Sequence, residues 1–212
     1  MPLCYQEELA AGGAWGLWHT EETEADMTQT FPWSAADEQG LTLVGHPVKR
    51  REYLSARLTL NALLAQKGHA YAGLQKDVYS KPHLPDAAYH ISISHAFPFA
   101  AAILHPQRPV GIDIEPMRPK IQRIAPRFLA AEELEYASGS LAALTILWAA
   151  KEALYKLYGQ KELIFRENIH VRPFLPQEKG TLSAQLLLFP DKVRNYDVVY
   201  QQWHNFFVAY VY

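Results

Sequence analysis

The stretch Tyr89-His90-Ile91-Ser92-Ile93-Ser94 decides the fold class, because apolar and polar residues alternate along it. Alternation with a period of two predicts a β-strand with one buried face. Two more runs follow, one apolar from Phe99 to Leu104 and one alternating from Val110 to Glu115. Because Pro106 and Pro109 separate these runs, we expect consecutive strands of a mostly antiparallel sheet.

A long helix is predicted before these strands. Pro47 suits the first turn of a helix, since it lacks an N–H that the helix would leave unbonded. Leu54 and Leu58 continue an apolar stripe with helical spacing, and Gly68 is a plausible end. Before this helix, the aromatic segment Trp15–His19 predicts a short strand. The acidic segment Glu21–Gly40 predicts a loop with at most short helix.

A second helix and a second set of strands are predicted after them. Ser140 is a typical N-cap, the apolar periodicity runs to Tyr158, and Gly159 follows as a C-terminal stop. Before this helix, prolines at 116, 119 and 126 divide the chain into short pieces. Three alternating segments in the tail read as strands, at residues 184–189, 196–203 and 206–212.

The order of elements, helix then strands, occurs twice along the chain and predicts an α+β fold. We expect two similar lobes, residues 1–108 and 109–212, each with a helix packed on a mostly antiparallel sheet. A pseudo-twofold axis would relate them. The junction from His105 to Pro109 is too short for a flexible linker, so the lobes are expected to pack as one unit.

Composition excludes several classes of protein. The chain has 212 residues, a formal net charge of -2 and 49% hydrophobic residues, as in globular proteins. Cys4 is the single cysteine, so no intrachain disulfide forms. No apolar run approaches the roughly 20 residues of a membrane span, and Glu7 and Glu8 argue against a secretion signal. We expect a cytoplasmic protein that binds neither nucleic acid nor membrane.

The run Gly111-Ile112-Asp113-Ile114-Glu115 is the sharpest local feature. In a strand, Asp113 and Glu115 point to one face, while the two isoleucines fill the other. Neighbouring carboxylates repel unless a cation lies between them, and oxygen donors suit Mg²⁺. The alternative is an edge strand whose acids are solvated or paired with arginines.

The run Trp148-Ala149-Ala150-Lys151-Glu152-Ala153-Leu154-Tyr155-Lys156 places Trp148, Glu152 and Lys156 on one helical face. An ordinary helix salt bridge between Glu152 and Lys156 explains this spacing. A functional interpretation makes Glu152 a metal ligand or general base, with Lys156 neutralising a phosphate.

Two further groups of polar residues are candidates for ligand contacts. Ser94 and His95 end the first strand, where ordinary turn chemistry is the alternative; a Ser-His hydrolase lacks its usual nucleophile elbow. Basic residues at a helix N-terminus oppose the helix dipole, a conflict that a bound anion relieves, although a solvated face is an equal alternative. These residues are Lys49, Arg50 and Arg51, with Lys81 in the loop before the strand.

Together the motifs Lys-Pro, Ser-x-Ser-His, Gly-Ile-Asp-Ile-Glu and Trp-x-x-Lys-Glu-Ala-x-x-Lys resemble the phosphopantetheinyl transferase superfamily, in its larger Sfp-like, two-lobed type. The last two motifs, Gly111–Glu115 and Trp148–Lys156, carry most of the resemblance. It implies a monomeric holo-carrier-protein synthase. Such an enzyme moves the phosphopantetheine arm of coenzyme A to a serine of an apo acyl carrier protein or peptidyl carrier domain, and releases adenosine 3′,5′-bisphosphate.

The resemblance also implies roles for individual residues. Asp113, Glu115 and Glu152 would bind Mg²⁺ (or Mn²⁺), and Glu152 would help to deprotonate the carrier serine. Lys156 and His95 would hold phosphate groups of coenzyme A, in a cleft between the lobes. The 3′-phosphate and adenine end would meet Ser94 and the basic residues of the first lobe, namely Lys49, Arg50, Arg51 and Lys81.

Departures from the family pattern concern the first lobe. Ser80 stands where relatives commonly have glycine before Lys-Pro, and Ala96 and Asn61 replace a usual serine and a usual basic residue. The acidic stretch Glu21–Gly40 lacks the basic residues of several relatives. Two competing functions are a Mg²⁺-dependent phosphohydrolase or nucleotidyl transferase, and a carrier-binding module that has lost catalysis.

Overall fold

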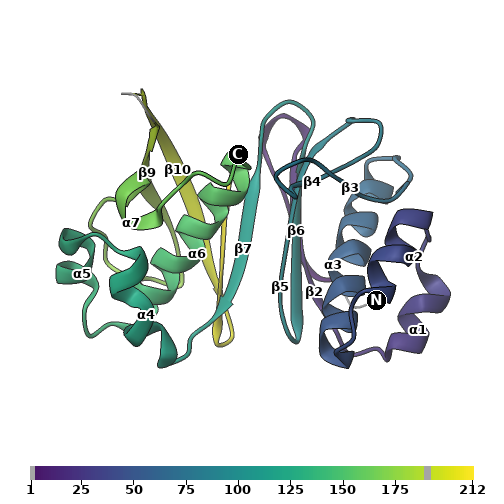
Figure 1. Ribbon diagram of the computed structural model, residues 1–212, viewed down its shortest axis with the longest axis horizontal. Coiled ribbons are helices and arrows are strands. Elements are labelled where there is room, and N and C mark those ends of the chain that lie inside the picture. Colours follow the sequence, from purple (N-terminus) through teal and green to yellow (C-terminus); the bar gives the residue numbers. More distant parts are fainter. Residues whose placement is uncertain (1–2, 189–191) are drawn as a thin grey trace. The chain divides into compact units, whose positions relative to one another are not determined.

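The computed structural model describes residues 3–188 and 192–212 of the chain. It divides into two compact units: an N-terminal unit up to Val110, which also includes Tyr212, and a C-terminal unit, Gly111–Val211. Each unit has an antiparallel sheet with helices packed on it (Figure 1). The predicted α+β class is therefore confirmed.

The N-terminal unit contains a four-stranded sheet in the order β1-β2-β6-β5, with every neighbouring pair antiparallel. Its strands are β1 (Leu3–Glu8), β2 (Ala14–His19), β5 (His90–Ala96) and β6 (Phe99–His105), and a small hairpin pairs β3 (Gln75–Lys76) with β4 (Pro82–His83). Its helices are α1 (Glu24–Thr30), α2 (Ala35–Thr42) and α3 (Pro47–Gln66). Figure 1 shows α3 against the sheet, with α1 and α2 on the outer side of α3.

Helix α3 begins at Pro47, as predicted, and the ring of His46 accepts a hydrogen bond from the Val48 N–H. Its apolar stripe, with Leu54 and Leu60 fully buried, packs on the alanine-rich strand β6. Small side chains on β6 let the helix approach closely, and this contact forms the core of the unit.

The segment from Glu21 to Gly40 is more helical than its composition predicts. Thr23 caps α1 and accepts a hydrogen bond from the Asp26 N–H, while the Asp26 carboxylate bonds back to Thr23. Ser34 caps α2 in a similar way through the Asp37 N–H. The expectation of a loop with at most short helix allowed for helices of 7 and 8 residues but not for their share of the segment. They form because these caps satisfy the N–H groups that short helices leave exposed.

The C-terminal unit contains a five-stranded antiparallel sheet in the order β7-β11-β10-β9-β8. Its strands are β7 (Gly111–Pro116), β8 (Ile169–Val171), β9 (Lys179–Leu188), β10 (Lys192–Trp203) and β11 (Phe206–Val211). Its helices are α4 (Lys120–Phe128), α5 (Ala131–Ala137), α6 (Leu141–Tyr158) and α7 (Phe165–Asn168). The predicted strand end at Phe189 lies outside the described residues.

Helix α6 has both of its predicted ends. The Ser140 hydroxyl accepts a hydrogen bond from the Ala143 N–H, and Gly159 adopts a left-handed conformation with φ 73°. Its apolar side packs on β7 and β11, and α4, α5 and α7 gather on the same side of the sheet as α6 (Figure 1). Helix α6 is thus the central helix of the unit and carries the second motif.

In the described part of the chain, no helix is both long enough and apolar enough to cross a membrane.

Candidate active site

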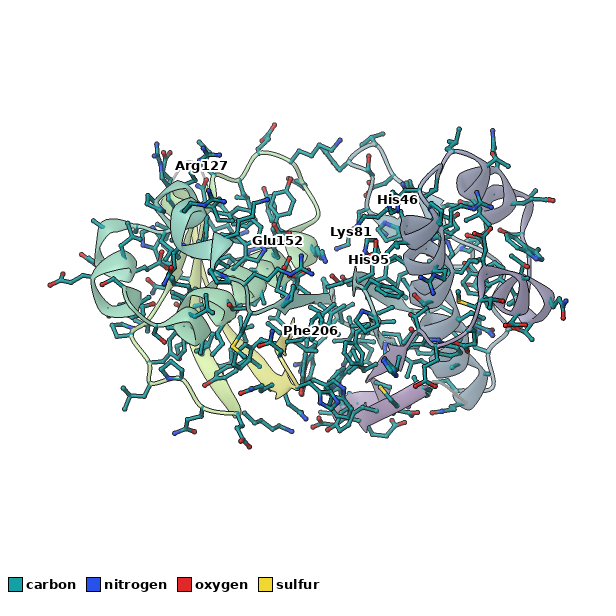
Figure 2. The ribbon with its side chains drawn as sticks, turned by 90° about the horizontal axis from the view of Figure 1, so that it is seen from below. His46, Lys81, His95, Arg127, Glu152 and Phe206 are labelled. Carbon is teal, nitrogen blue, oxygen red and sulfur yellow. The ribbon has the colours of Figure 1, made fainter. Side chains whose placement is uncertain are left out.

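Strand β7 and helix α6 of the C-terminal unit carry the acidic residues that the sequence predicts for a metal site. Asp113 and Glu115 lie two residues apart on β7 and therefore share a face of the sheet. Ile112 and Ile114 are buried on the opposite face. Glu152 lies on α6, the helix that packs across β7 (Figure 2). Asp113 is only 4% exposed, so its carboxylate is largely removed from bulk water.

Gly111 explains how α6 comes so close to β7. A Cβ atom on Gly111 would lie 1.9 Å from the carbonyl oxygen of Ala153 and 2.8 Å from the backbone nitrogen of Leu157. No side chain fits there, so the glycine lets the helix backbone rest on the strand. Because Gly111 faces α6, Asp113 two residues further along faces it as well.

Two side chains of α6 hold the two acids of β7. The ammonium of Lys156 lies 2.6 Å from Oδ1 of Asp113 and donates a second hydrogen bond, of 3.1 Å, to the Ile112 carbonyl. The indole N–H of Trp148 donates to Oε1 of Glu115 over 2.9 Å. Glu152 lies midway between Trp148 and Lys156 on the helix. Trp148 and Lys156 are thus directed toward β7, and Glu152 lies between them on the same predicted face of the helix.

The electrostatics of this face are unfavourable for three ionised carboxyl groups. Burial, followed by the charge of Asp113, raises the pKa of Glu115 to about 7. Burial and then the charge of Asp113 also raise the pKa of Glu152 to about 7, while Lys156 acts in the opposite direction. The three acids are therefore electrostatic neighbours, and positive charge at this face would relieve their mutual repulsion.

The donor chemistry of this face fits a hard cation, because Asp113, Glu115 and Glu152 offer carboxylate oxygens, which Mg²⁺ prefers. Among residues 3–188 and 192–212, however, no three histidine, cysteine, aspartate or glutamate side chains gather closely enough to hold a metal ion. Lys156 and Trp148 occupy oxygens of Asp113 and Glu115 in this arrangement. The three-carboxylate magnesium site stays a prediction.

In the N-terminal unit, a buried carboxylate gathers several of the predicted ligand residues. Glu52, in the second turn of α3, is 4% exposed and accepts a hydrogen bond of 3.0 Å from the Phe97 N–H. The Lys49 ammonium lies 2.6 Å from the same carboxylate, and Nδ1 of His95 lies 3.5 Å from it. Glu52 thus joins the start of α3 to the turn after β5.

Sequence reasoning missed Glu52, although a signal was present. Glu52, Ala56 and Leu60 follow one another at helical spacing, and the latter two are fully buried. An acid on the buried stripe of a helix needs a partner or a ligand. The cations Lys49, Arg50 and Arg51 stand out in this turn of the sequence, whereas the acid beside them does not.

The two arginines at the start of α3 have different surroundings. Arg50 donates to the Glu24 carboxylate and to the carbonyls of Leu41 and Val44, so its guanidinium connects α1, α2 and α3. The guanidinium of Arg51 lies over the Phe97 ring, 4.6 Å from its centre, beside the turn that Glu52 holds. The phosphate-binding role expected of both arginines is not tested by these contacts and stays a prediction.

Lys81 and Ser94 both lie in the N-terminal unit, Lys81 in the turn just before β4 and Ser94 in β5. Ser94 is buried within β5, which continues to Ala96, two residues past the predicted end. Burial lowers the pKa of Lys81, and burial followed by the charge of Lys81 lowers the pKa of His90. Ser80, before Lys81, has a φ of 72°. This left-handed conformation explains why a glycine suits the position and shows that serine adopts the same turn.

Comparison with models of protein families matches residues 109–211 to the 4′-phosphopantetheinyl transferase superfamily. No curated protein matches the chain. The matched region spans β7 and α6. It therefore includes the two motifs that carry most of the resemblance and the carboxylates of Asp113, Glu115 and Glu152. It supports a transferase of phosphopantetheinyl groups. The C-terminal unit is therefore similar to the 4′-phosphopantetheinyl transferase superfamily over nearly all of its length.

Proposed function

We propose that this chain transfers the phosphopantetheine arm of coenzyme A to a serine of an apo acyl carrier protein or peptidyl carrier domain, in a Mg²⁺-dependent reaction. The observation that carries the proposal is the shared face of β7 and α6. There Lys156 pairs with Asp113, and the charges of Asp113, Glu115 and Lys156 all act on Glu152, within the region matched to the superfamily. Phosphoryl transfer asks mainly for positioning and charge neutralisation, and this face offers both.

In the proposed reaction, the carrier serine is the nucleophile and Glu152 accepts its proton. The serine oxygen forms a bond to the phosphorus that carries the pantetheine arm. The bond from that phosphorus to the bridging oxygen of the pyrophosphate breaks, and adenosine 3′,5′-bisphosphate leaves with that oxygen. Lys156 supplies fixed positive charge to the phosphate oxygens. A bound Mg²⁺, held by the three carboxylates, would neutralise negative charge on the pyrophosphate.

The residues around Glu52 are the proposed contacts for the phosphates of coenzyme A in the N-terminal unit. Lys49 and Arg51 lie in the first turns of the 20-residue helix α3, and His95 lies beside them at the end of β5. A helix N-terminus and adjacent cations both attract an anion. Ser94 and Lys81 belong to the same proposal on the strength of the sequence motifs.

Helix α4 supports a carrier protein as the partner. The segment 116–131 contains no acidic residue, and its four basic side chains are all exposed. They are Arg118, Lys120, Arg123 and Arg127, and Figure 2 labels the last of these. The other side of α4 is anchored by Ile121, Ala125 and Phe128, which are buried. An acidic helical carrier would complement this surface, although the whole chain carries a formal net charge of only -2.

Mass spectrometry of a carrier protein tests the proposal. Purified chain, coenzyme A, Mg²⁺ and an apo carrier should yield a carrier heavier by one phosphopantetheine. A carrier with its acceptor serine changed to alanine is the matched control and should gain no mass. Transfer should stop when the metal is chelated and when Asp113→Asn replaces the wild type.

The same experiment separates the competing functions. Breakdown of coenzyme A without any carrier would indicate a phosphohydrolase or nucleotidyl transferase instead. Binding of coenzyme A and carrier without a mass gain on any acyl or peptidyl carrier would indicate a non-catalytic module. Either result would overturn the proposed transfer.

A further inference from the structure

Lys151 is fully buried in the middle of the second motif, next to Glu152. Its ammonium lies 2.5 Å from Oε2 of Glu133 in α5. It also donates to the carbonyl of Phe128 over 3.0 Å and to that of Ile169 over 2.6 Å. A buried lysine is costly unless paired and hydrogen-bonded, and these acceptors meet that condition.

Glu133 is equally well bonded. It is 3% exposed, and its Oε2 also accepts a hydrogen bond from the Ala130 N–H at the start of α5. Its Oε1 accepts a hydrogen bond of 2.8 Å from the Val171 N–H of β8. The ion pair of Lys151 and Glu133 therefore connects the central helix α6 to the end of α4, to α5 and to strand β8.

The pair holds α6 at a position that matters for its neighbour. Successive residues of an α-helix point about 100° apart, so fixing the direction of Lys151 fixes the direction of Glu152. Gly111 sets how closely α6 approaches β7, but a glycine contact does not by itself prevent rotation of the helix about its axis. The buried ion pair supplies a directional constraint at the same turn of the helix.

We propose that Lys151 is a positioning residue: its ion pair with Glu133 sets the rotation of α6, so that Glu152 is directed toward Asp113 and Glu115. Lys151 itself does not touch substrate. The inference rests on the proposed function for the role of Glu152, but its structural part is testable without activity. It separates the two lysines of the motif, since Lys156 reaches Asp113 on the strand and Lys151 is enclosed by the fold.

The experiment compares Lys151→Met, Glu133→Gln and the double variant in the transfer assay. We expect each single change to lower kcat by roughly 100-fold, the loss that a misplacement of about 1 Å causes, with the KM for coenzyme A unchanged. We expect the double variant to recover part of the loss of Lys151→Met, because no carboxylate is left buried without its cation. A lysine that touches substrate could not be rescued by a change at Glu133.

The opposite results would overturn the inference. One is a wild-type kcat in folded Lys151→Met. Another is a folded double variant as inactive as Lys151→Met, which would place Lys151 on the substrate. Where the lysine variants fail to fold, Glu133→Gln decides alone, because a wild-type kcat in that variant would exclude positioning through the pair.

An NMR measurement gives a second readout that needs no activity. The indole N–H of Trp148 donates to Glu115, so its signal reports the rotation of α6 relative to β7. Trp148→Phe identifies the signal. We expect it to shift in Lys151→Met and in Glu133→Gln but not in Lys161→Gln, an exposed lysine beyond the same helix. If the Trp148 signal shifts but the wild-type chain transfers no phosphopantetheine, the proposed function is wrong and the structural part of the inference holds. If the signal shifts in neither variant, the inference is wrong.

Discussion

The ammonium of Lys156 lies 2.6 Å from the carboxylate of Asp113, so this cation joins helix α6 to strand β7. The spacing of Glu152 and Lys156 along the helix is equally suited to an ordinary helix salt bridge. The contact with Asp113 instead brings the lysine to the face that the carboxylates share. One positive charge thereby acts on three acids, since it also opposes the rise in the pKa of Glu115 and Glu152 that burial and Asp113 cause.

Replacing this cation tests its two effects separately. In Lys156→Gln we expect transfer, as kcat/KM for coenzyme A, to fall by about 100-fold, the typical loss on removing one electrostatic contact to the transition state. We also expect the pKa of Glu152 to rise above about 7, because the opposing charge is gone. Carbon-detected NMR titration of the carboxyl groups measures the second effect without substrate. An unchanged titration of both glutamates would contradict the arrangement.

The raised pKa values of Glu115 and Glu152 predict how stability depends on pH in the presence of a chelator. The ordinary pKa of a glutamate side chain is 4.5, but in the folded chain both groups have a pKa of about 7. The folded state therefore binds more protons between these values, and the free energy of unfolding falls as the pH rises from 4.5 to 7.

Glu152→Gln removes one of these groups. At pH 8 the variant should exceed the wild type in unfolding free energy by about 1–3 kcal/mol, and at pH 4 the two should nearly agree. Urea denaturation at both values measures the difference. A variant less stable than the wild type at pH 8 would show that the ionised carboxylate is stabilised by groups other than those described.

Gly111→Ala tests the close approach of α6 to β7. The new methyl group would lie 1.9 Å from the Ala153 carbonyl oxygen, so the helix has to move. We expect a loss of at least about 1–3 kcal/mol of unfolding free energy, as in overpacked cores, and loss of transfer. Gly45→Ala is the matched control, since no atom lies within 4 Å of its Cβ position. Equal stability of the two variants would contradict the contact.

Ser80→Gly should stabilise the protein. Ser80 has a φ of 72°, where a side chain costs energy that glycine avoids. We expect a gain of about 0.5–1 kcal/mol in unfolding free energy by thermal or urea denaturation. Ser138→Gly provides the control, because Ser138 has a φ of -60° and should gain nothing from glycine. A loss of stability in Ser80→Gly would mean that the serine side chain supplies a compensating contact.

Reversing charge on α4 tests the proposed carrier surface. In Arg123→Glu/Arg127→Glu we expect the KM for an acidic carrier to rise by at least about tenfold, with the KM for coenzyme A unchanged. Higher salt should weaken the wild-type interaction in the same way. Lys192→Glu/Arg194→Glu on β10 reverses two exposed cations of the same unit, the same change in net charge, and should have no such effect. An equal rise in both variants would indicate a general effect of net charge.

The sequence predicts those helices and strands that have recognisable capping residues or a regular apolar periodicity. Helix α3 starts at Pro47, and α6 runs from the Ser140 cap to Gly159, because these residues set the terminal hydrogen bonds. The face shared by Asp113 and Glu115 follows from strand periodicity alone. Strand β1 was not predicted, because Leu3–Glu8 lacks a regular alternation and is set by pairing with β2.

The surroundings of the candidate site depend on burial that a sequence does not display. Lys151 and Lys156 occur in one motif and look alike in sequence, yet one is enclosed by carbonyls and the other reaches Asp113. Glu52 acquires its importance from the turn at Phe97, 45 residues away. Such long-range contacts decide which charged residue is structural, and local patterns carry no record of them.

The contacts along β8 also bear on how the protein behaves at high concentration. This strand ends its sheet, and the outward backbone groups of an end strand can pair with another chain. Here the Val171 N–H bonds to Glu133, the Val171 carbonyl to the Tyr136 hydroxyl, and the Ile169 carbonyl to Lys151. Side chains thus take the place of a further strand, and Lys151, with Glu133 and Tyr136, leaves these backbone groups of β8 unavailable for pairing with another chain.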